Sequence, residues 1–146
     1  MKKKLLLCLA LLMLALPLGA CGKKNKAPLY PIDYGASALF TEEDLEGAVK
    51  KIQAEFRSWD GCEMHSLRYA GDEMCNEESI AWLNKMAEAR DKDLKFTRCA
   101  CFFSNFHSPV DESKAGAWNT DYEYTDWQWW LGRTAEGEWT LMDWGY

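Results

Sequence analysis

The sequence lacks the short motifs that mark common catalytic chemistries. Its 146 residues contain no GxSxG turn, no Walker phosphate loop, no HExxH helix and no CxxC pair. Histidine is scarce, with only His65 and His107. Either ring can act as a general base, but a histidine without an evident partner is more often structural or solvated. The motifs therefore assign no catalytic residue, and we expect no metal and no cofactor.

Basic residues are few in the body of the chain. From Ser37 onward, 22 acidic residues stand against 11 Lys and Arg, a net charge of −11. Phosphate backbones repel such a surface, so we expect no nucleic-acid partner. The negative charge favours solubility and names no other partner.

A long apolar run occurs only once, from Leu5 to Leu18, behind the basic residues 2–4. This form is typical of a secretory signal, and the run is shorter than the ~20 residues of a spanning helix. It closes with Leu-Gly-Ala-Cys21, which resembles the bacterial lipobox. That resemblance implies a signal peptide over residues 1–20 and a diacylglycerol thioether on Cys21. The alternative is an ordinary secreted protein with a chance cysteine.

Lipidation of Cys21 would hold the protein on the extracytoplasmic face of the cell membrane, because two or three acyl chains anchor stably. Residues 21–36 carry two prolines, several lysines and no periodic apolar pattern. We interpret them as the lipidated N-terminus and a tether spanning about 20 Å. Residues 37–146 are long enough for a single domain with one core.

Two helices are predicted from apolar stripes at helical spacing. The first covers residues 42–59, with Thr41 as its N-cap, acidic residues in its first turn and Asp60-Gly61 after its end. The second covers residues 76–90. Strands are predicted over residues 62–70, 95–104, 122–133 and 138–144, the last two forming a hairpin, with a long loop over residues 105–121.

Four cysteines remain once Cys8 leaves with the signal and Cys21 carries lipid: Cys62, Cys75, Cys99 and Cys101. Disulfides persist outside the cytoplasm. Cys99 and Cys101 lie two apart on a predicted strand, so their side chains emerge in parallel and pair poorly. Cys62 and Cys75 would then each reach one of them; buried free thiols are the alternative. The spacings do not favour zinc.

Aromatic residues are abundant near the C-terminus, where six of the eight tryptophans lie between Trp118 and Trp144. Tyr and Trp suit ligand recognition and also fill the cores of small sheet domains. Strand alternation puts aromatic side chains on both faces of residues 122–133. The candidate ligand-binding residues are Tyr124, Trp127, Trp129 and Trp130.

Two carboxylates, Asp126 and Asp143, are embedded in these aromatic strands. A carboxylate buried there with a partner has a pKa suited to acid–base chemistry. The alternative is a solvent-facing position on an alternating strand.

The C-terminal run from Tyr122 to Tyr146, YEYTDWQWWLGRTAEGEWTLMDWGY, resembles the closing hairpin of small lipoproteins from gut clostridia and their relatives. Those proteins carry a domain of unknown function. The stretches Phe40-Thr-Glu-Glu-Asp-Leu, Gly61-Cys62 and Tyr69-Ala-Gly-Asp-Glu73 are similar to the first helix and strand of that family. The likeness covers residues 40–146.

The order of elements is also similar to the cystatin-like, nuclear-transport-factor-2-like architecture. The resemblance implies an α+β fold in which N-terminal helices pack on a curved antiparallel sheet that ends in a long C-terminal hairpin. In such folds the sheet wraps a helix and leaves a pocket. The architecture hosts enzymes, carriers and binding modules, so it names no function.

Three functional hypotheses follow. The favoured one is a non-enzymatic, lipid-anchored surface domain that binds a small ligand or a protein partner through the concave sheet face. The second is a pocket enzyme of isomerase or hydrolase type that uses Asp126, Asp143 or His65. The third is an immunity-like or inhibitor protein that blocks a partner through its acidic surface.

Overall fold

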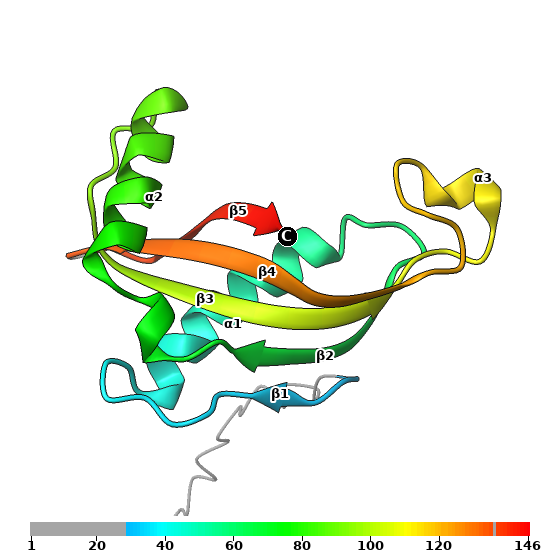
Figure 1. The fold of residues 1–146 in the computed structure, drawn as a ribbon, viewed down its shortest axis with the longest axis horizontal. Coiled ribbons are helices and arrows are strands. Elements are labelled where there is room, and N and C mark those ends of the chain that lie inside the picture. Colours follow the sequence, from blue (N-terminus) through cyan, green and yellow to red (C-terminus); the bar gives the residue numbers. More distant parts are fainter. Residues whose placement is uncertain (1–28, 136) are drawn as a thin grey trace, which may run out of the picture.

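The computed structural model describes residues 29–135 and 137–146. The expected α+β class is confirmed: within these residues, three helices accompany a five-stranded sheet (Figure 1). The elements follow in the order β1 (Ile32–Asp33), α1 (Glu42–Phe56), β2 (Glu63–Tyr69), a 3₁₀ turn (Asp72–Met74), α2 (Glu77–Ala89), β3 (Phe96–His107), α3 (Glu112–Ala115), β4 (Glu123–Thr134) and β5 (Trp139–Gly145). The expected signal peptide, Cys21 and the first part of the expected tether lie outside the described residues.

The strand order in the sheet follows the chain, β1-β2-β3-β4-β5. Strands β2 to β5 form an antiparallel meander, as expected, but β1 runs parallel to β2 and makes the sheet mixed. Ile32 of β1 pairs with Leu67, and Tyr30 and Tyr34 pack against the core. The outer edge of β2 offers unpaired backbone groups that β1 satisfies. The folded part therefore begins before Ser37, within the expected tether.

Helix α1 begins where the sequence predicts. The Thr41 side chain accepts a hydrogen bond from the backbone of Asp44, and the Asp44 carboxylate accepts one from the backbone of Thr41, which completes a capping box. The helix ends at Phe56, so Trp59 lies in the turn that follows. There its ring stacks on Trp129 of β4 at 5.0 Å between centroids. Burial of the apolar stripe fixes α1 against one face of the sheet.

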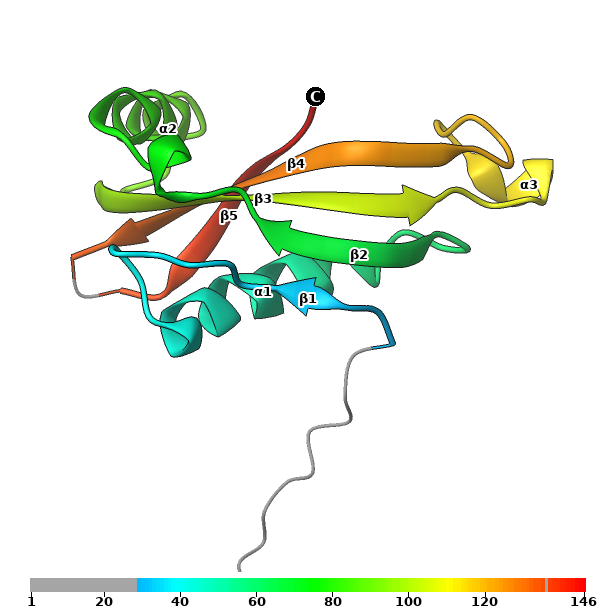
Figure 2. The same ribbon diagram turned by 60° about the horizontal axis from the view of Figure 1, so that its bottom comes forward.

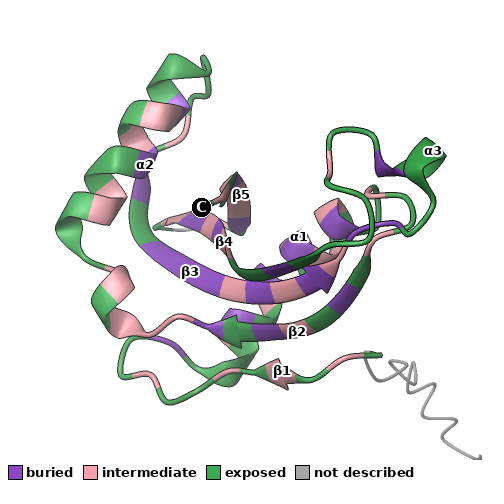
Figure 3. Ribbon diagram, turned by 45° about the vertical axis from the view of Figure 1, so that its right-hand side comes forward, coloured by how far each residue is buried: buried purple, intermediate pink, exposed green. Residues whose placement is uncertain are grey.

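Helix α2 covers the opposite face at one end of the sheet (Figure 2). The side chain of Asn76 caps its first turn by accepting a hydrogen bond from the backbone of Ser79. Leu83 and Ala87 are its buried residues, and they pack with Phe96 and Met142. Figure 3 shows α2 largely exposed outside this narrow stripe, while β3 beneath it is buried along most of its length. The helix thus stands over the sheet with one side open.

Two outcomes in the second half differ from expectation. Residues 105–107, expected in the long loop, continue β3, and α3 forms within the rest of that segment. Strand β4 contains a bulge, because Ser104 pairs with Trp127 whereas Phe106 pairs with Tyr124. Asp126 in the bulge has a positive φ of 53°. The extra residue shifts the alternation, so Tyr124 faces the same side as Trp127 rather than the opposite one.

Candidate ligand-binding groove

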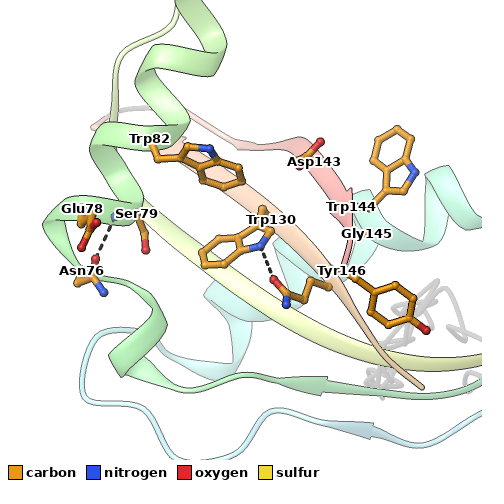
Figure 4. Close-up of a pocket in the computed structure, with 10 residues that line it drawn as sticks. Asn76, Glu78, Ser79, Trp82, Trp130, Asp143, Trp144, Gly145 and Tyr146 are labelled. Atoms are coloured by element: carbon orange, nitrogen blue, oxygen red, sulfur yellow. Dashed lines mark hydrogen bonds between the residues drawn. The ribbon is translucent and has the colours of Figure 1, made fainter. Parts of the chain in front are cut away.

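The open side of α2 and the sheet next to it enclose a groove with a cavity volume of about 440 Å³ (Figure 4). Helix α2 and its cap supply one wall, β4 supplies the floor, and the end of β5 with the C-terminal residue supplies the far side. The lining residues are Asn76, Glu78, Ser79, Trp82, Gln128, Trp130, Asp143, Trp144, Gly145 and Tyr146.

Trp82 and Trp130 form an aromatic corner in this groove. Their ring centroids lie 5.4 Å apart and their planes meet at 76°. Figure 4 shows the two rings next to one another, one from the helix and one from the sheet. Trp82 is 39% exposed although it sits on a well-formed helix. An exposed, rigidly mounted indole is a feature of binding surfaces more than of cores.

The orientation of Trp130 is fixed by a neighbour on the same strand. Its indole Nε1 donates a hydrogen bond to Oε1 of Gln128 at 2.9 Å. The contact uses the amide oxygen of Gln128 and leaves its NH₂ group as a donor on the groove floor. Trp130 also packs against the small core beneath α2. The floor is therefore held in place before any ligand arrives.

The charged residues that line the groove are both acidic, Glu78 and Asp143. Oδ1 of Asp143 accepts a 3.4 Å hydrogen bond from Nη2 of Arg90, and Nη1 of the same arginine donates to the carbonyl of Met142. The arginine joins the end of α2 to β5 and sets the carboxylate beside the groove. Glu78 has no ion-pair partner in the part of the chain that the structure describes.

The far side of the groove connects to the main core. The Trp144 ring lies 6.3 Å from both Trp59 and Trp129, and the Tyr146 ring lies 5.1 Å from Trp127. These contacts hold the C-terminal residues against the sheet. Both rings remain accessible, at 40% for Trp144 and 76% for Tyr146.

The four aromatic residues singled out from the sequence do not share one surface. Only Trp130 lines the groove. Tyr124, Trp127 and Trp129 face the side covered by α1. Trp129 is completely buried, and its Nε1 donates to Oγ of Ser104 at 2.8 Å. These three therefore form an aromatic core together with Trp59, which agrees with the packing alternative.

Trp82 is not among the ligand-binding residues expected from the sequence, although the helical pattern around it carries a signal. The apolar stripe of α2 runs through Ile80, Leu83, Met86 and Ala87, and Trp82 falls outside that stripe. A tryptophan on the solvent side of an amphipathic helix is a candidate for ligand contact, because its large ring is available at the surface. That Trp130 is the neighbour of Trp82 follows only from the fold, which places α2 beside β4.

The candidate acid–base residues do not assemble in one place. Asp126 pairs with Arg68 at 2.9 Å on an exposed surface, and Asp143 lies at the groove. Nδ1 of His65 lies 3.0 Å from Oε1 of Glu123. His107, whose ring stacks near His65, contacts Asp121 at 3.3 Å. This histidine–carboxylate cluster lies on the open surface of the meander.

The cysteines divide between the two ends of the sheet. Cys62 precedes Glu63, which pairs with His107 of β3. Cys101 is six residues before His107 on that strand, or about 20 Å from it, and is therefore far from Cys62. The expected pairing of Cys62 with Cys99 or Cys101 is therefore wrong in this fold. All four thiols are free, and the described residues hold no group of three or more Cys, His, Asp or Glu side chains suited to a metal ion.

Cys75 and Cys99 do come together, beneath the start of α2. A hydrogen bond with the Cys99 thiol is the main cause that lowers the pKa of Cys75, and the same contact raises the pKa of Cys99. The Tyr69 hydroxyl lies 3.2 Å from Sγ of Cys75. Burial raises the pKa of the neighbouring Cys101 to about 12. One half of the expected pairing, between Cys75 and the β3 cysteines, is thus compatible with the structure.

Comparisons of the chain with protein-family models, with curated protein sequences and with solved structures found no match. Over residues 29–135 and 137–146, no helix combines the length and apolar character needed to cross a membrane.

Proposed function

We propose that this protein is a lipid-anchored, non-enzymatic binding protein whose ligand site is the groove between α2 and strands β4 and β5. The observation that carries the proposal is the aromatic corner of Trp82 and Trp130 inside a groove of about 440 Å³. This volume lies within the range of small-molecule sites. The corner is held by regular secondary structure, so little ordering is required on binding.

Binding rather than catalysis is favoured by the arrangement of the polar groups. Asp143 is the only candidate acid–base residue at the groove, and it is 41% exposed and paired with Arg90. His65 and Asp126 lie outside the residues that line the groove. A catalytic constellation requires an acid or base, an orienting group and a water-excluding site in one place. The pocket-enzyme hypothesis therefore has less support than a binding role.

The membrane attachment rests on the N-terminal sequence. A basic start, an apolar run and a lipobox-like ending at Cys21 support export and lipidation. The groove would then face the extracytoplasmic side of the cell membrane. Intact-mass spectrometry of the protein from cells should show a mature N-terminus at Cys21 with fatty acyl mass. Substitution of Cys21 by Ser should release the protein from the membrane fraction, and retention of the variant would contradict the proposal.

We also propose a cystatin-like, nuclear-transport-factor-2-like architecture. The support is a single long helix, α1, packed against one face of an antiparallel meander. The groove differs from the pocket expected for that architecture, because the face covered by α1 is filled by packed aromatic side chains. An experimental structure compared with members of that architecture would test this proposal.

Ligand binding is tested by tryptophan fluorescence and thermal stability against a panel of small molecules that includes sugars, peptides and organic cations. A true ligand should raise the melting temperature of the full chain, and Trp82→Ala should abolish that rise. Tyr122→Ala is the matched control, because Tyr122 is 50% exposed and lies outside the groove. No response to any member of the panel, or equal responses of both variants, would contradict the proposal.

A further inference from the structure

We propose that the groove takes an organic cation whose methylated ammonium head sits in the corner between Trp82 and Trp130. This inference rests on the proposed binding function and specifies its ligand class. Indole faces attract cations through their negative quadrupole, most strongly for tryptophan, and aromatic cages are the usual receptors for quaternary ammonium groups.

The charge of the groove agrees with a cationic ligand. Among the described lining residues neither Lys nor Arg occurs, whereas Glu78 and Asp143 are acidic. The surrounding domain carries a large excess of acidic residues as well. An anionic ligand would be repelled, while a cation would be attracted before contact and held afterwards.

The geometry of the two indoles favours a compact head over a flat ring. A sugar or planar aromatic ligand stacks on the face of a single ring, and two rings contact it best when their planes are parallel. Trp82 and Trp130 instead meet at 76° with centroids 5.4 Å apart. Two nearly perpendicular walls contact a roughly spherical trimethylammonium group from two directions at once.

The hydrogen bonds around the corner favour a methylated ammonium over a primary one. A primary ammonium brings three N–H donors that each need an acceptor. The two indoles that form the corner carry no acceptor, and Oε1 of Gln128 and Oδ1 of Asp143 already accept from Trp130 and Arg90. Glu78, which has no ion-pair partner among the described residues, supplies negative charge to the groove. A quaternary head has no N–H donor and requires only aromatic faces and negative charge.

The experiment compares choline with 3,3-dimethylbutan-1-ol, its uncharged carbon isostere, by calorimetric titration of the full mature protein in a polyoxyethylene detergent. Choline should bind roughly tenfold more tightly than the isostere, since the two differ only in charge. Methylamine should bind more weakly than tetramethylammonium. Raising the salt concentration should weaken choline binding, because the carboxylates are partly exposed.

Substitutions inside and outside the groove test whether choline binds there. Trp82→Ala should weaken choline binding roughly tenfold, and Glu78→Gln and Asp143→Asn should each weaken it severalfold. Glu88→Gln is the matched control, because this exposed acid on α2 does not line the groove.

The outcomes separate this inference from the binding function. Equal affinity for choline and its isostere, or choline binding that survives Trp82→Ala, would overturn the inference. Binding of a neutral sugar that depends on Trp82, with no response to choline, would also overturn it while leaving the groove as a ligand site. Absence of any Trp82-dependent ligand would overturn both.

Discussion

Arg133 near the end of β4 donates a hydrogen bond from Nη1 to Oδ1 of Asp44 at 2.6 Å and thereby joins the closing hairpin to the first turn of α1. The same turn receives a second bond from the hairpin, because Nε1 of Trp139 donates to the carbonyl of Asp44 at 2.8 Å. The two bonds fix the first helix to the last two strands, and they join residues 89 and 95 positions apart in the chain.

This link predicts a loss of stability in acid. The hydrogen bond from Arg133, followed by those from Thr41, lowers the pKa of Asp44 from 3.8 to about 2. A carboxylate with a lower pKa in the folded state than in the unfolded state stabilises the fold at pH values above its unfolded pKa. For Asp44, that stabilisation should be lost as the pH falls from 3.8 towards 2. Asp44→Asn should cost about 1 kcal/mol at neutral pH, after allowance for solvent screening.

Thermal melts across this acidic range check the prediction. The difference between the wild type and Asp44→Asn should shrink as the pH falls. Glu138→Gln is the matched control, because Glu138 pairs with Lys51 at 3.0 Å but is 88% exposed, and it should change stability by only a few tenths of a kcal/mol. A difference that grows in acid would contradict the assignment of this pair.

The hydrogen bond between Trp129 and Ser104 is completely enclosed, so its loss should be costly. Ser104→Ala leaves the buried indole N–H without an acceptor and should lower the free energy of unfolding by about 1–3 kcal/mol. Urea unfolding measures the change. Ser58→Ala removes an exposed hydroxyl that bonds the carbonyl of Glu55 and should have little effect. If both substitutions changed the free energy of unfolding equally, the prediction that the buried hydrogen bond contributes more stability than the exposed one would be wrong.

Gly132 is required by a close approach rather than by a turn. A Cβ atom at this position would lie 2.5 Å from Cγ of the buried Phe96 ring. Gly132→Ala should therefore destabilise the protein by about 1–3 kcal/mol. In a Phe96→Ala background the same substitution should cost less, because the side-chain atoms beyond Cβ that cause the clash are absent. A cost that is unchanged in that background would place the strain elsewhere.

Oxidation should join Cys75 to Cys99 and leave Cys62 free. The Cys99 thiol donates to the carbonyl of Met74, the residue before Cys75, whereas Cys62 lies towards the other end of the sheet. Treatment with oxidised glutathione transfers two electrons and two protons from the thiol pair to the reagent. Peptide mapping without reductant should then recover the Cys75–Cys99 cross-link. A cross-link that contains Cys62 would contradict the strand register.

The elements that sequence analysis predicted well are those set by local chemistry. Helix α1 begins after Thr41 because the cap, the acidic first turn and the apolar stripe all lie within a few residues. Helix α2 begins after Asn76 for the same reason. The end of α1 was misplaced because Trp59 continues the apolar period, although its ring packs on Trp129 from the following turn.

The features that sequence analysis missed depend on partners distant in the chain. The bulge at Asp126 is defined by the pairing of β4 with β3, and strict alternation along β4 alone places Tyr124 on the face opposite Trp127. Strand β1 forms only because β2 leaves an edge open. The groove joins Trp82 to Trp130 across segments whose relative placement no local pattern reveals.

The most direct test of the central claim is an NMR titration that follows the indole N–H signals of the eight tryptophans. Addition of choline should shift the signals of Trp82 and Trp130, which form the groove corner, and leave that of the buried Trp129 unchanged. Assignment by the Trp82→Phe and Trp130→Phe variants identifies the two signals. If the Trp82 and Trp130 signals stay fixed while other indoles move, the groove is not the ligand site.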